Sequence, residues 1–354
     1  MSRSENTLGK IGPDDFSRMV LPRLGRMRDE VRTGPAYGVD TSVIDLGNGQ
    51  GLAISSDPLS LIPTLGLQES AWLSVHLLVN DMATTGFSPM FAQFVLNLPP
   101  DLTREDFRTY WDYIHQFCKE CGVAVTGGHT GQIEGQNSTI SGGGTMFLTA
   151  PIDKIITSDG GQPGDVIVVT KESALNATSI LAMSFPETVS NRLGREVLDT
   201  ARENFYRTSS LKDGVTVAGA LEAKRELRAM HDVTEGGVLG AILEMAKASG
   251  CGFRVESERI PTGHAQMKIA RLFGIDHRLS VGAGSMIMAV RSGYEDQLVK
   301  SLQAQSIPAA IVGRLAPESK GFLLIEEGVE NPFSFDGKDP YWPAFYRALN
   351  QGWR

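Results

Sequence analysis

Residues 39–57 of the chain read VDTSVIDLGNGQGLAISSD, and this stretch sets the first element of the fold. The apolar residues of 41–46 and 52–56 predict two strands, and the Gly-Asn-Gly turn between them joins the strands as a β-hairpin. Helical spacing of apolar residues follows soon after the hairpin, so this half of the chain mixes strands with helices. The other half shows the same mixture, which predicts an α/β or α+β class.

Two acids flank the open end of the hairpin. Asp40 lies eight residues before the centre of the turn and Asp57 nine residues after it, so antiparallel pairing brings them nearly opposite each other. Like charges opposed across a sheet are destabilising. A divalent cation would offset the repulsion, because Mg²⁺ is typically held by one or two carboxylates together with substrate phosphates. The alternative is that both acids are solvated and diverge with the twist of the sheet.

A third acid, Asp81, lies in a helix predicted from about Gln68 to Thr85. Apolar residues occur nearly all round this helix, so the helix is predicted to be buried. Asp81 and its neighbour Asn80 therefore need polar partners. A metal or polar site is the favoured interpretation, and a salt bridge to an internal Arg or Lys is the alternative.

Two glycine-rich stretches are candidate anion sites. Residues 126–131, TGGHTG, follow a strand predicted over 123–126. Backbone N–H groups in such a loop can cradle an anion, although turns also use glycine for steric reasons. His129 in this loop is open to three interpretations: a base, a metal ligand or a hydrogen-bonded core residue. The second stretch is the helix start at 231–237, HDVTEGG, where the helix N terminus would attract phosphate or Thr234 would cap the helix. The sequence has neither a P-loop nor a strand–G-x-G-x-x-G–helix unit.

The remaining pattern divides the chain into two domains. A turn cluster at 160–164, GGQPG, is the best boundary, and it predicts domains over 1–160 and 161–354. The other predicted elements are helices over 12–32, 103–121, 237–249, 265–273 and 294–303, and strands over 91–96, 145–149, 165–170, 252–256, 285–290, 309–313 and 322–326.

Composition narrows the class of protein. The formal net charge of the 354 residues is −8, which argues against nucleic-acid and anionic-membrane partners but not against ATP, since a metal can carry positive charge. The three cysteines exclude a disulfide-rich secreted fold, and the C-x-x-C pair Cys118 and Cys121 is interpreted as core packing. The sequence shows no signal peptide and no apolar run near the ~20 residues of a membrane span, which predicts a cytoplasmic protein.

These motifs together resemble the aminoimidazole-ribonucleotide (AIR) synthetase superfamily, also called PurM-like, over nearly the whole chain. In the first half, the stretches that carry the resemblance are 34–44 (GPAYGVDTSVI), 55–58 (SSDP), 80–89 (NDMATTGFSP) and 127–130 (GGHT). In the second half they are 164–171 (GDVIVVTK) and 231–237 (HDVTEGG). Six motifs in this order are a specific signature.

The resemblance implies a PurM-like two-domain fold, in which an N-terminal half-barrel forms a homodimer and a C-terminal α/β domain closes the cleft over ATP. It implies that Asp40, Asp57 and Asp81 are the Mg²⁺ ligands. The resemblance also implies cofactor contacts by Asn80, Gly127, Gly128 and Thr130. Several relatives have a glycine-rich ATP-binding segment near the N terminus, which is reduced here to residues 8–11, and Lys10 of this segment is the remaining predicted cofactor contact. The catalytic candidates are His129 and Asp232.

The closest overall likeness is to the hydrogenase-maturation (HypE-like) branch and to AIR-synthase-related proteins. The maturation enzyme dehydrates a carbamoyl group carried on a C-terminal cysteine, whereas the last cysteine of this sequence is Cys251, so that form of the reaction is not expected. Selenophosphate synthetases need a reactive cysteine near the N terminus, and no cysteine precedes Cys118. Thiamine-phosphate kinases carry a double acid where this chain has Val39 and Asp40, and an acid at His129.

The sequence therefore predicts an ATP- and Mg²⁺-dependent enzyme that activates a small amide, carbamoyl or carboxyl-type substrate by phosphorylation. A small-molecule kinase of the thiamine-phosphate-kinase type and a non-catalytic nucleotide-binding or maturation scaffold are the alternatives. The implied partners are a second copy of the chain, a small-molecule substrate and, for the HypE-like branch, a maturation partner protein.

Overall fold

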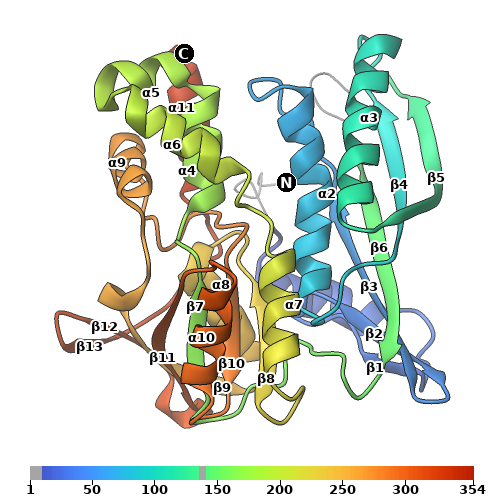
Figure 1. Cartoon of the computed structure of the whole chain (residues 1–354), viewed down its shortest axis with the longest axis vertical. Coiled ribbons are helices and arrows are strands. Elements are labelled where there is room, and N and C mark those ends of the chain that lie inside the picture. The colour runs from blue at the N-terminus through green and yellow to red at the C-terminus, as the bar shows by residue number, and fades with distance from the viewer. Residues whose placement is uncertain (1–9, 135–140) are drawn as a thin grey trace.

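The computed structural model describes residues 10–134 and 141–354, and two β-sheets lie side by side in it (Figure 1). The first sheet has six strands in the order β1-β2-β3-β6-β4-β5, and the second has seven in the order β13-β12-β9-β11-β7-β10-β8. The strands of the first sheet are β1 (Val31–Thr33), β2 (Ser42–Gly47), β3 (Gln50–Pro58), β4 (Phe91–Leu98), β5 (Ala124–Gln132) and β6 (Ser141–Pro151). Those of the second are β7 (Val166–Thr170), β8 (Leu227–Asp232), β9 (Cys251–Glu256), β10 (Met286–Val290), β11 (Ala309–Pro317), β12 (Phe322–Glu326) and β13 (Val329–Pro332).

Two helices, α2 (Leu67–Ala83) and α3 (Arg104–Glu120), cover one face of the first sheet (Figure 1). Their core is apolar, and Leu78 of α2 is fully buried in one cluster with Phe94 of β4. The N-cap predicted for α3 is confirmed, because the Thr103 hydroxyl accepts an N–H group of the first turn at 3.0 Å. Such a cap is worth about 1 kcal/mol.

Helices cover both faces of the second sheet, which explains why its central strands are apolar without alternation. In β7, Ile167 and Val169 pack with α8, whereas Val166 and Val168 pack with α7 and α10. A further apolar cluster joins α4, α5, α6, α9 and α11. The helices of this half are α4 (Leu175–Ser184), α5 (Pro186–Leu193), α6 (Arg195–Phe205), α7 (Leu211–Ala220), α8 (Gly237–Ala248), α9 (His264–Phe273), α10 (Glu295–Ala304) and α11 (Tyr341–Asn350), with single 3₁₀ turns at Ser257–Arg259 and Glu318–Lys320.

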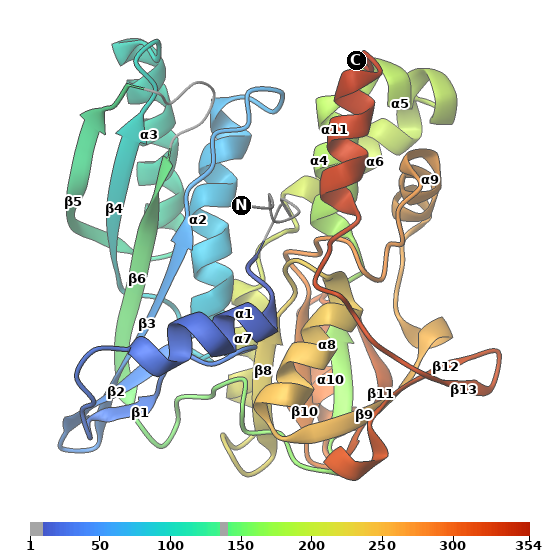
Figure 2. The same cartoon turned by 180° about the vertical axis from the view of Figure 1, so that it is seen from behind.

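The two halves are joined by side-chain hydrogen bonds as well as by the chain. Asn80 of α2 is fully buried; its amide nitrogen donates to the Thr208 carbonyl at 3.0 Å and its oxygen accepts the Ser210 N–H at 2.7 Å. The N-terminal helical turns lie at the junction of the two sheets (Figure 2). They are α1 (Pro13–Asp15), a π-helical turn (Phe16–Val20) and a 3₁₀ turn (Leu21–Arg23).

Most of the predicted elements are confirmed, the hairpin among them. Strand β2 pairs with β3, with Val43 opposite Ala53 and Gly47 opposite Gln50, and Asn48 in the turn has a φ of 54°. Cys118 and Cys121 are free thiols, and burial raises the pKa of Cys118 to about 12, which confirms that this pair packs in the core. None of the helices in the described residues is long and apolar enough to cross a membrane. The boundary at 160/161 stays a prediction.

Two predicted features are wrong, and some elements were not predicted. The helix expected over 12–32 ends at Arg23, because Gly25 adopts a positive φ of 76°. In addition, none of the apolar residues of Phe16–Arg23 is buried; residues 10–23 are called the N-terminal arm below. Residues 126–131 are not a loop: they belong to β5, where the neighbouring strand β4 supplies ladder partners for their backbone. Strands β1, β8 and β13 and helix α11 were not predicted. In α11 the buried residues Tyr341, Ala344 and Ala348 do recur at helical spacing, and Pro343 lies in the first turn, where proline is tolerated.

Candidate functional site

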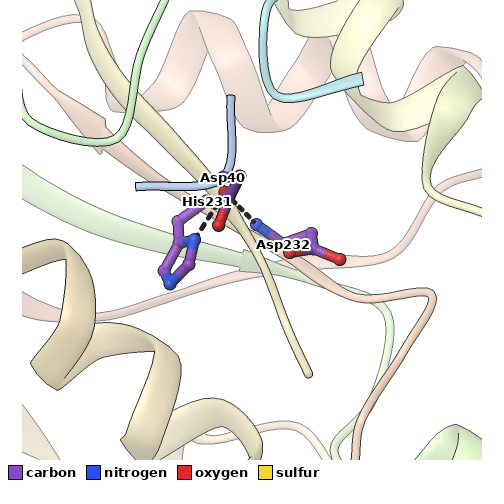
Figure 3. Close-up of side chains that lie close together, drawn as sticks. All are labelled: Asp40, His231 and Asp232. Carbon is purple, nitrogen blue, oxygen red and sulfur yellow. Dashed lines mark hydrogen bonds and ion pairs between the residues drawn. The ribbon is translucent and has the colours of Figure 1, made fainter. Parts of the chain in front are cut away.

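Three side chains from both halves of the molecule converge at the end of β8 (Figure 3). The Asp40 carboxylate, from the segment before β2, lies with one oxygen 2.5 Å from Nδ1 of His231. The same oxygen is 3.4 Å from the backbone N–H of Asp232. One side-chain ligand atom of each residue lies within 4.8 Å of the other two. The hairpin half and the β8 half therefore share one polar site.

His231 is clamped between two carboxylates. Its Nδ1 faces Asp40 and its Nε2 lies 3.1 Å from Oε2 of Glu244 on α8. Burial lowers the pKa of this imidazole, but the attraction of Asp40 and Glu244 outweighs burial and raises the pKa well above its ordinary value. Both ring nitrogens then carry protons, so His231 acts as a donor that orients Asp40, and the carboxylates are left as the candidate metal ligands.

Asp232 shows whether the residues of this site fit a cation. The residue is only 1% exposed, and neither carboxylate oxygen has a hydrogen-bond partner among the described residues. Burial and the neighbouring Asp40 raise its pKa to about 8. An unpartnered buried carboxylate costs several kcal/mol when ionised, and a divalent cation at these oxygens would remove that cost. The donor set therefore fits a hard cation such as Mg²⁺, which prefers oxygen ligands.

Two further acids complete the cluster. Asp81 accepts a hydrogen bond from the Ser55 hydroxyl at 2.6 Å, and burial together with the charges of Asp232, Asp57 and Asp40 raises its pKa well above the ordinary value. Burial also raises the pKa of Asp57 to about 6. The alternative of a salt bridge for Asp81 is wrong, since no Arg or Lys of the described part of the chain pairs with it within 4.0 Å.

The route by which these acids meet differs from the predicted one. The β2–β3 ladder ends with Ser42 opposite Ile54, so Asp40 and Asp57 are not a cross-strand pair. Asp40 is turned instead toward β8 by His231 and the Asp232 backbone. Long-range packing, not the hairpin register, brings the acids together.

Lys10 provides a cation at the rim of this cluster. Its Nζ donates to the Thr234 hydroxyl at 3.0 Å. Burial lowers the pKa of its ammonium, but four carboxylates, with Glu244 and Asp232 the strongest, outweigh burial and raise the pKa. Lys10 is thus placed where a phosphate would lie between it and the acids, and its phosphate contact stays a prediction. Leu8 and Gly9 of the same segment lie outside the described residues.

The other predicted site residues lie away from this cluster. Both amide atoms of Asn80 are used inside the chain, which does not favour its predicted nucleotide contact. Gly128 on β5 pairs with Phe94, Phe94 with Gly144, and Gly144 with Asp57. Three strand spacings separate Gly128 from Asp57, which is about 14 Å. Gly127 and Thr130 lie on the same edge strand.

His129 also lies on β5, opposite Val95, and its side chain is exposed. The interpretation as a hydrogen-bonded core residue is therefore wrong. The roles of base and metal ligand stay predictions, and within one chain His129 is on the wrong strand to reach Asp57. The capping role of Thr234 is wrong as well, because the N-cap of α8 is Gly236 and has no side-chain cap.

His231 and Glu244 are the site residues that sequence reasoning missed. Glu244 lies on α8, whose other core positions are apolar. The argument that singled out Asp81, an acid on a helix that is apolar nearly all round, applies to Glu244 too and could have found it. His231 stands directly before Asp232 in the quoted motif, but only the structure shows the two carboxylates that hold its ring.

Two family models match the chain in order: AIR synthase related protein, N-terminal domain, over residues 38–147, and AIR synthase related protein, C-terminal domain, over residues 162–326. The chain belongs to the AIR synthase related family. The acids Asp40, Asp57 and Asp81 fall in the first match, and Asp232 falls in the second.

Curated relatives of this family member carry several activities in their names. A putative hydrogenase expression/formation protein of Methanocaldococcus jannaschii is 26% identical over 71% of this chain and 72% of its own length. A carbamoyl dehydratase HypE of Rhizobium leguminosarum bv. viciae is 23% identical over 71% of this chain and 69% of its own. A thiamine-monophosphate kinase of Salmonella typhimurium is 21% identical over 90% of this chain and 95% of its own.

Solved structures confirm the PurM-like fold predicted for this family member. E. coli HypE, a hydrogenase maturation protein, matches with a TM-score of 0.68 at 20% identity over 83% of this chain and 88% of that chain. A HypE–HypF complex matches with 0.68 at 18% identity over 83% and 92%. The maturation protein HypE in complex with ATP matches with 0.64 at 16% identity over 93% of each chain. The predicted resemblance to the HypE-like branch is confirmed.

Proposed function

We propose that this chain is an ATP- and Mg²⁺-dependent enzyme that activates a small amide, carbamoyl or carboxyl-type substrate by phosphorylation. The observation that carries the proposal is the Asp232 carboxylate, buried without a partner beside Asp40. The metal ion that accompanies a triphosphate would supply positive charge between these acids and the phosphates. Two named relatives, a carbamoyl dehydratase and a kinase, and a structural neighbour that binds ATP support this class of reaction.

The chain's own residues divide the work. Asp40, Asp57, Asp81 and Asp232 would hold Mg²⁺, which when bound neutralises charge on the phosphates and on the group that is transferred. His231 donates a hydrogen bond to Asp40 and fixes the direction of its carboxylate. Asp232 has a raised pKa, and its predicted catalytic role is to face the reacting atoms from the β8 side.

The first experiment is calorimetric titration of ATP and of a non-hydrolysable analogue, each with and without Mg²⁺. Wild type is compared with Asp232→Asn, with Asp57→Asn and with the control Asp45→Asn, whose carboxylate is paired with Arg32 outside the cluster. We expect Mg²⁺-dependent binding in wild type and control, and loss of that binding in the two cluster variants. Equal binding with and without Mg²⁺ would refute the metal site, and no binding in wild type would leave the scaffold alternative.

A small-molecule kinase is the second candidate, favoured by the likeness to thiamine-monophosphate kinase, which extends over 336 residues. The two candidates differ in their product. Transfer of the γ-phosphoryl group to a stable phosphate ester of the substrate would support the kinase. Release of inorganic phosphate together with a dehydrated or substituted substrate would support the activating enzyme.

We further propose that the chain is a homodimer formed through the uncovered face of the first sheet. Val95 of β4 is 42% exposed there, and Val125 and Ile133, in and just after the edge strand β5, are exposed by 38% and 42%. An edge strand also has unpaired backbone groups. A second copy on this face would bury the apolar residues and cover Gly127, Gly128, His129 and Thr130. Sedimentation of Val95→Glu against wild type tests this: the variant is expected to be monomeric, and an unchanged dimer would place the interface elsewhere. A maturation partner, as in the HypE–HypF complex, is a further proposal.

A further inference from the structure

The C-terminal segment beyond the family match reaches back to the candidate site. After β13 the chain crosses to the turn at residues 234–237, between β8 and α8. Asp339 of this segment is only 4% exposed. One carboxylate oxygen accepts the N–H of Gly236 at 2.8 Å, and the other accepts the N–H of Tyr341 at 2.8 Å. The carboxylate of Asp339 thus takes the place at the N terminus of α8 that the sequence left open for a phosphate.

A second contact of the same segment lies on Glu235. One oxygen of Glu235 accepts the indole N–H of Trp342 at 3.1 Å. The other accepts the backbone N–H of Lys10 at 2.8 Å. The N-terminal arm and the C-terminal segment therefore meet on one carboxylate.

Packing reinforces both hydrogen-bonded contacts. Gly236 has a φ of 85°, and a Cβ added to it would lie 2.8 Å from the ring of Phe335. The ring therefore closes directly over the backbone of the turn. Residues 333–342 therefore contact the turn in three ways. The Phe335 ring packs on Gly236, the Asp339 carboxylate accepts the Gly236 N–H, and the Trp342 indole donates to Glu235.

We propose that residues 333–342, the strap, are a positioning element of the acid cluster, and that Asp339 and Trp342 are its positioning residues. By fixing the 234–237 turn, the strap holds Glu235 and the Lys10 ammonium at the rim of the carboxylates, since Lys10 bonds to Thr234 and Glu235 of that turn. The strap also reserves the α8 N terminus for the chain's own carboxylate, so ligand phosphates are held at the cation and Lys10 instead. This inference rests on the proposed function in that the site it serves is the Mg²⁺ site.

The test combines metal affinity with local hydrogen exchange on the full chain. Mn²⁺ alone is titrated by electron paramagnetic resonance into wild type, Asp339→Asn and Trp342→Phe. The controls are Asp336→Asn, whose one side-chain hydrogen bond within the described residues is to the N–H of nearby Lys338, and Trp353→Phe, which lies beyond the C-terminal end of α11. Amide exchange of residues 234–240 is measured on the same samples, and melting temperatures record any general loss of stability.

We expect Mn²⁺ to bind about tenfold more weakly to Asp339→Asn and about fivefold more weakly to Trp342→Phe, as the loss of a hydrogen bond to a charged group implies. Exchange at 234–240 is expected to accelerate in both strap variants, and the controls should match wild type. A role in stability alone would lower the melting temperature while Mn²⁺ affinity stayed within twofold of wild type; that outcome overturns the inference.

Mn²⁺ binding by wild type distinguishes failure of the proposed function from failure of this inference. If wild type binds no Mn²⁺, the metal site itself is refuted. The exchange measurement then decides the strap: acceleration confined to 234–240 in Asp339→Asn and Trp342→Phe supports its hold on the turn, and unchanged exchange overturns it.

Discussion

The most informative single change is Asp232→Asn. The Asp232 carboxylate is buried, and neither of its oxygens has a hydrogen-bond partner among the described residues. Without a cation, its ionised form therefore lowers the free energy of unfolding. Asparagine keeps the shape of the side chain and removes the charge. We therefore expect the variant to be more stable than wild type when Mg²⁺ is absent, and to gain nothing when Mg²⁺ is added.

The magnitude follows from the pKa of this residue. The ordinary pKa of an Asp carboxyl is 3.8, and burial with the charge of Asp40 raises the pKa of Asp232 to about 8. A carboxyl group whose folded pKa is raised begins to destabilise above pH 3.8, and its cost grows until the pH passes 8. The interval between pH 3.8 and pH 7 is roughly three pKa units, so the folded state is destabilised by at most about 4 kcal/mol at pH 7. At pH 5 the interval is roughly one pKa unit, so the largest possible cost falls to about 1–2 kcal/mol.

The assay is urea unfolding of wild type and Asp232→Asn at pH 5 and pH 7, each with and without Mg²⁺. In metal-free buffer the variant should be more stable by about 1–4 kcal/mol at pH 7, with a smaller difference at pH 5. Mg²⁺ at a hundred times its Kd should stabilise wild type by about 2.7 kcal/mol and leave the variant unchanged. A variant that is less stable than wild type at pH 7 without metal, or equally stabilised by Mg²⁺, would refute the reasoning.

Three further changes test other parts of the structure. His231→Gln removes the cation that bridges two carboxylates and should cost about 3–5 kcal/mol, measured by urea unfolding in metal-free buffer; a loss below 1 kcal/mol would contradict the clamp. Gly236→Ala meets the Phe335 ring at a φ of 85° and should cost about 2 kcal/mol, clearly more than Gly250→Ala, which has a φ of 62° in open space. Burial lowers the pKa of His76 to about 3 from 6.5, so its stabilising contribution as a neutral ring is lost as the pH falls below 6.5; His76→Leu should narrow the stability gap between pH 7.5 and pH 5 by about 2 kcal/mol, and an unchanged gap would show that His76 does not sense the pH.

Local patterns in the sequence predicted the elements that depend on local chemistry. The alternating hairpin strands, the Gly-Asn-Gly turn and the Thr103 cap are set by residues a few positions apart, and the order of motifs was enough to identify the family. The same patterns failed for β5, because its glycines look like a loop until β4 pairs with them. They did not fail for α11, where buried Tyr341, Ala344 and Ala348 recur at helical spacing; that helix was available to the same reasoning and was missed.

The sequence by itself singled out the acids of the cluster, since Asp81 on an apolar helix and the acids at the hairpin were predicted to need compensation, and the cation remains a prediction. Only the tertiary structure decided which groups meet. Asp40 finds Asp232, 192 residues later, through a buried histidine, and Asp339 finds Gly236, 103 residues earlier. Contacts at such separations are fixed by how two sheets and their helices pack, and no local spacing encodes that packing.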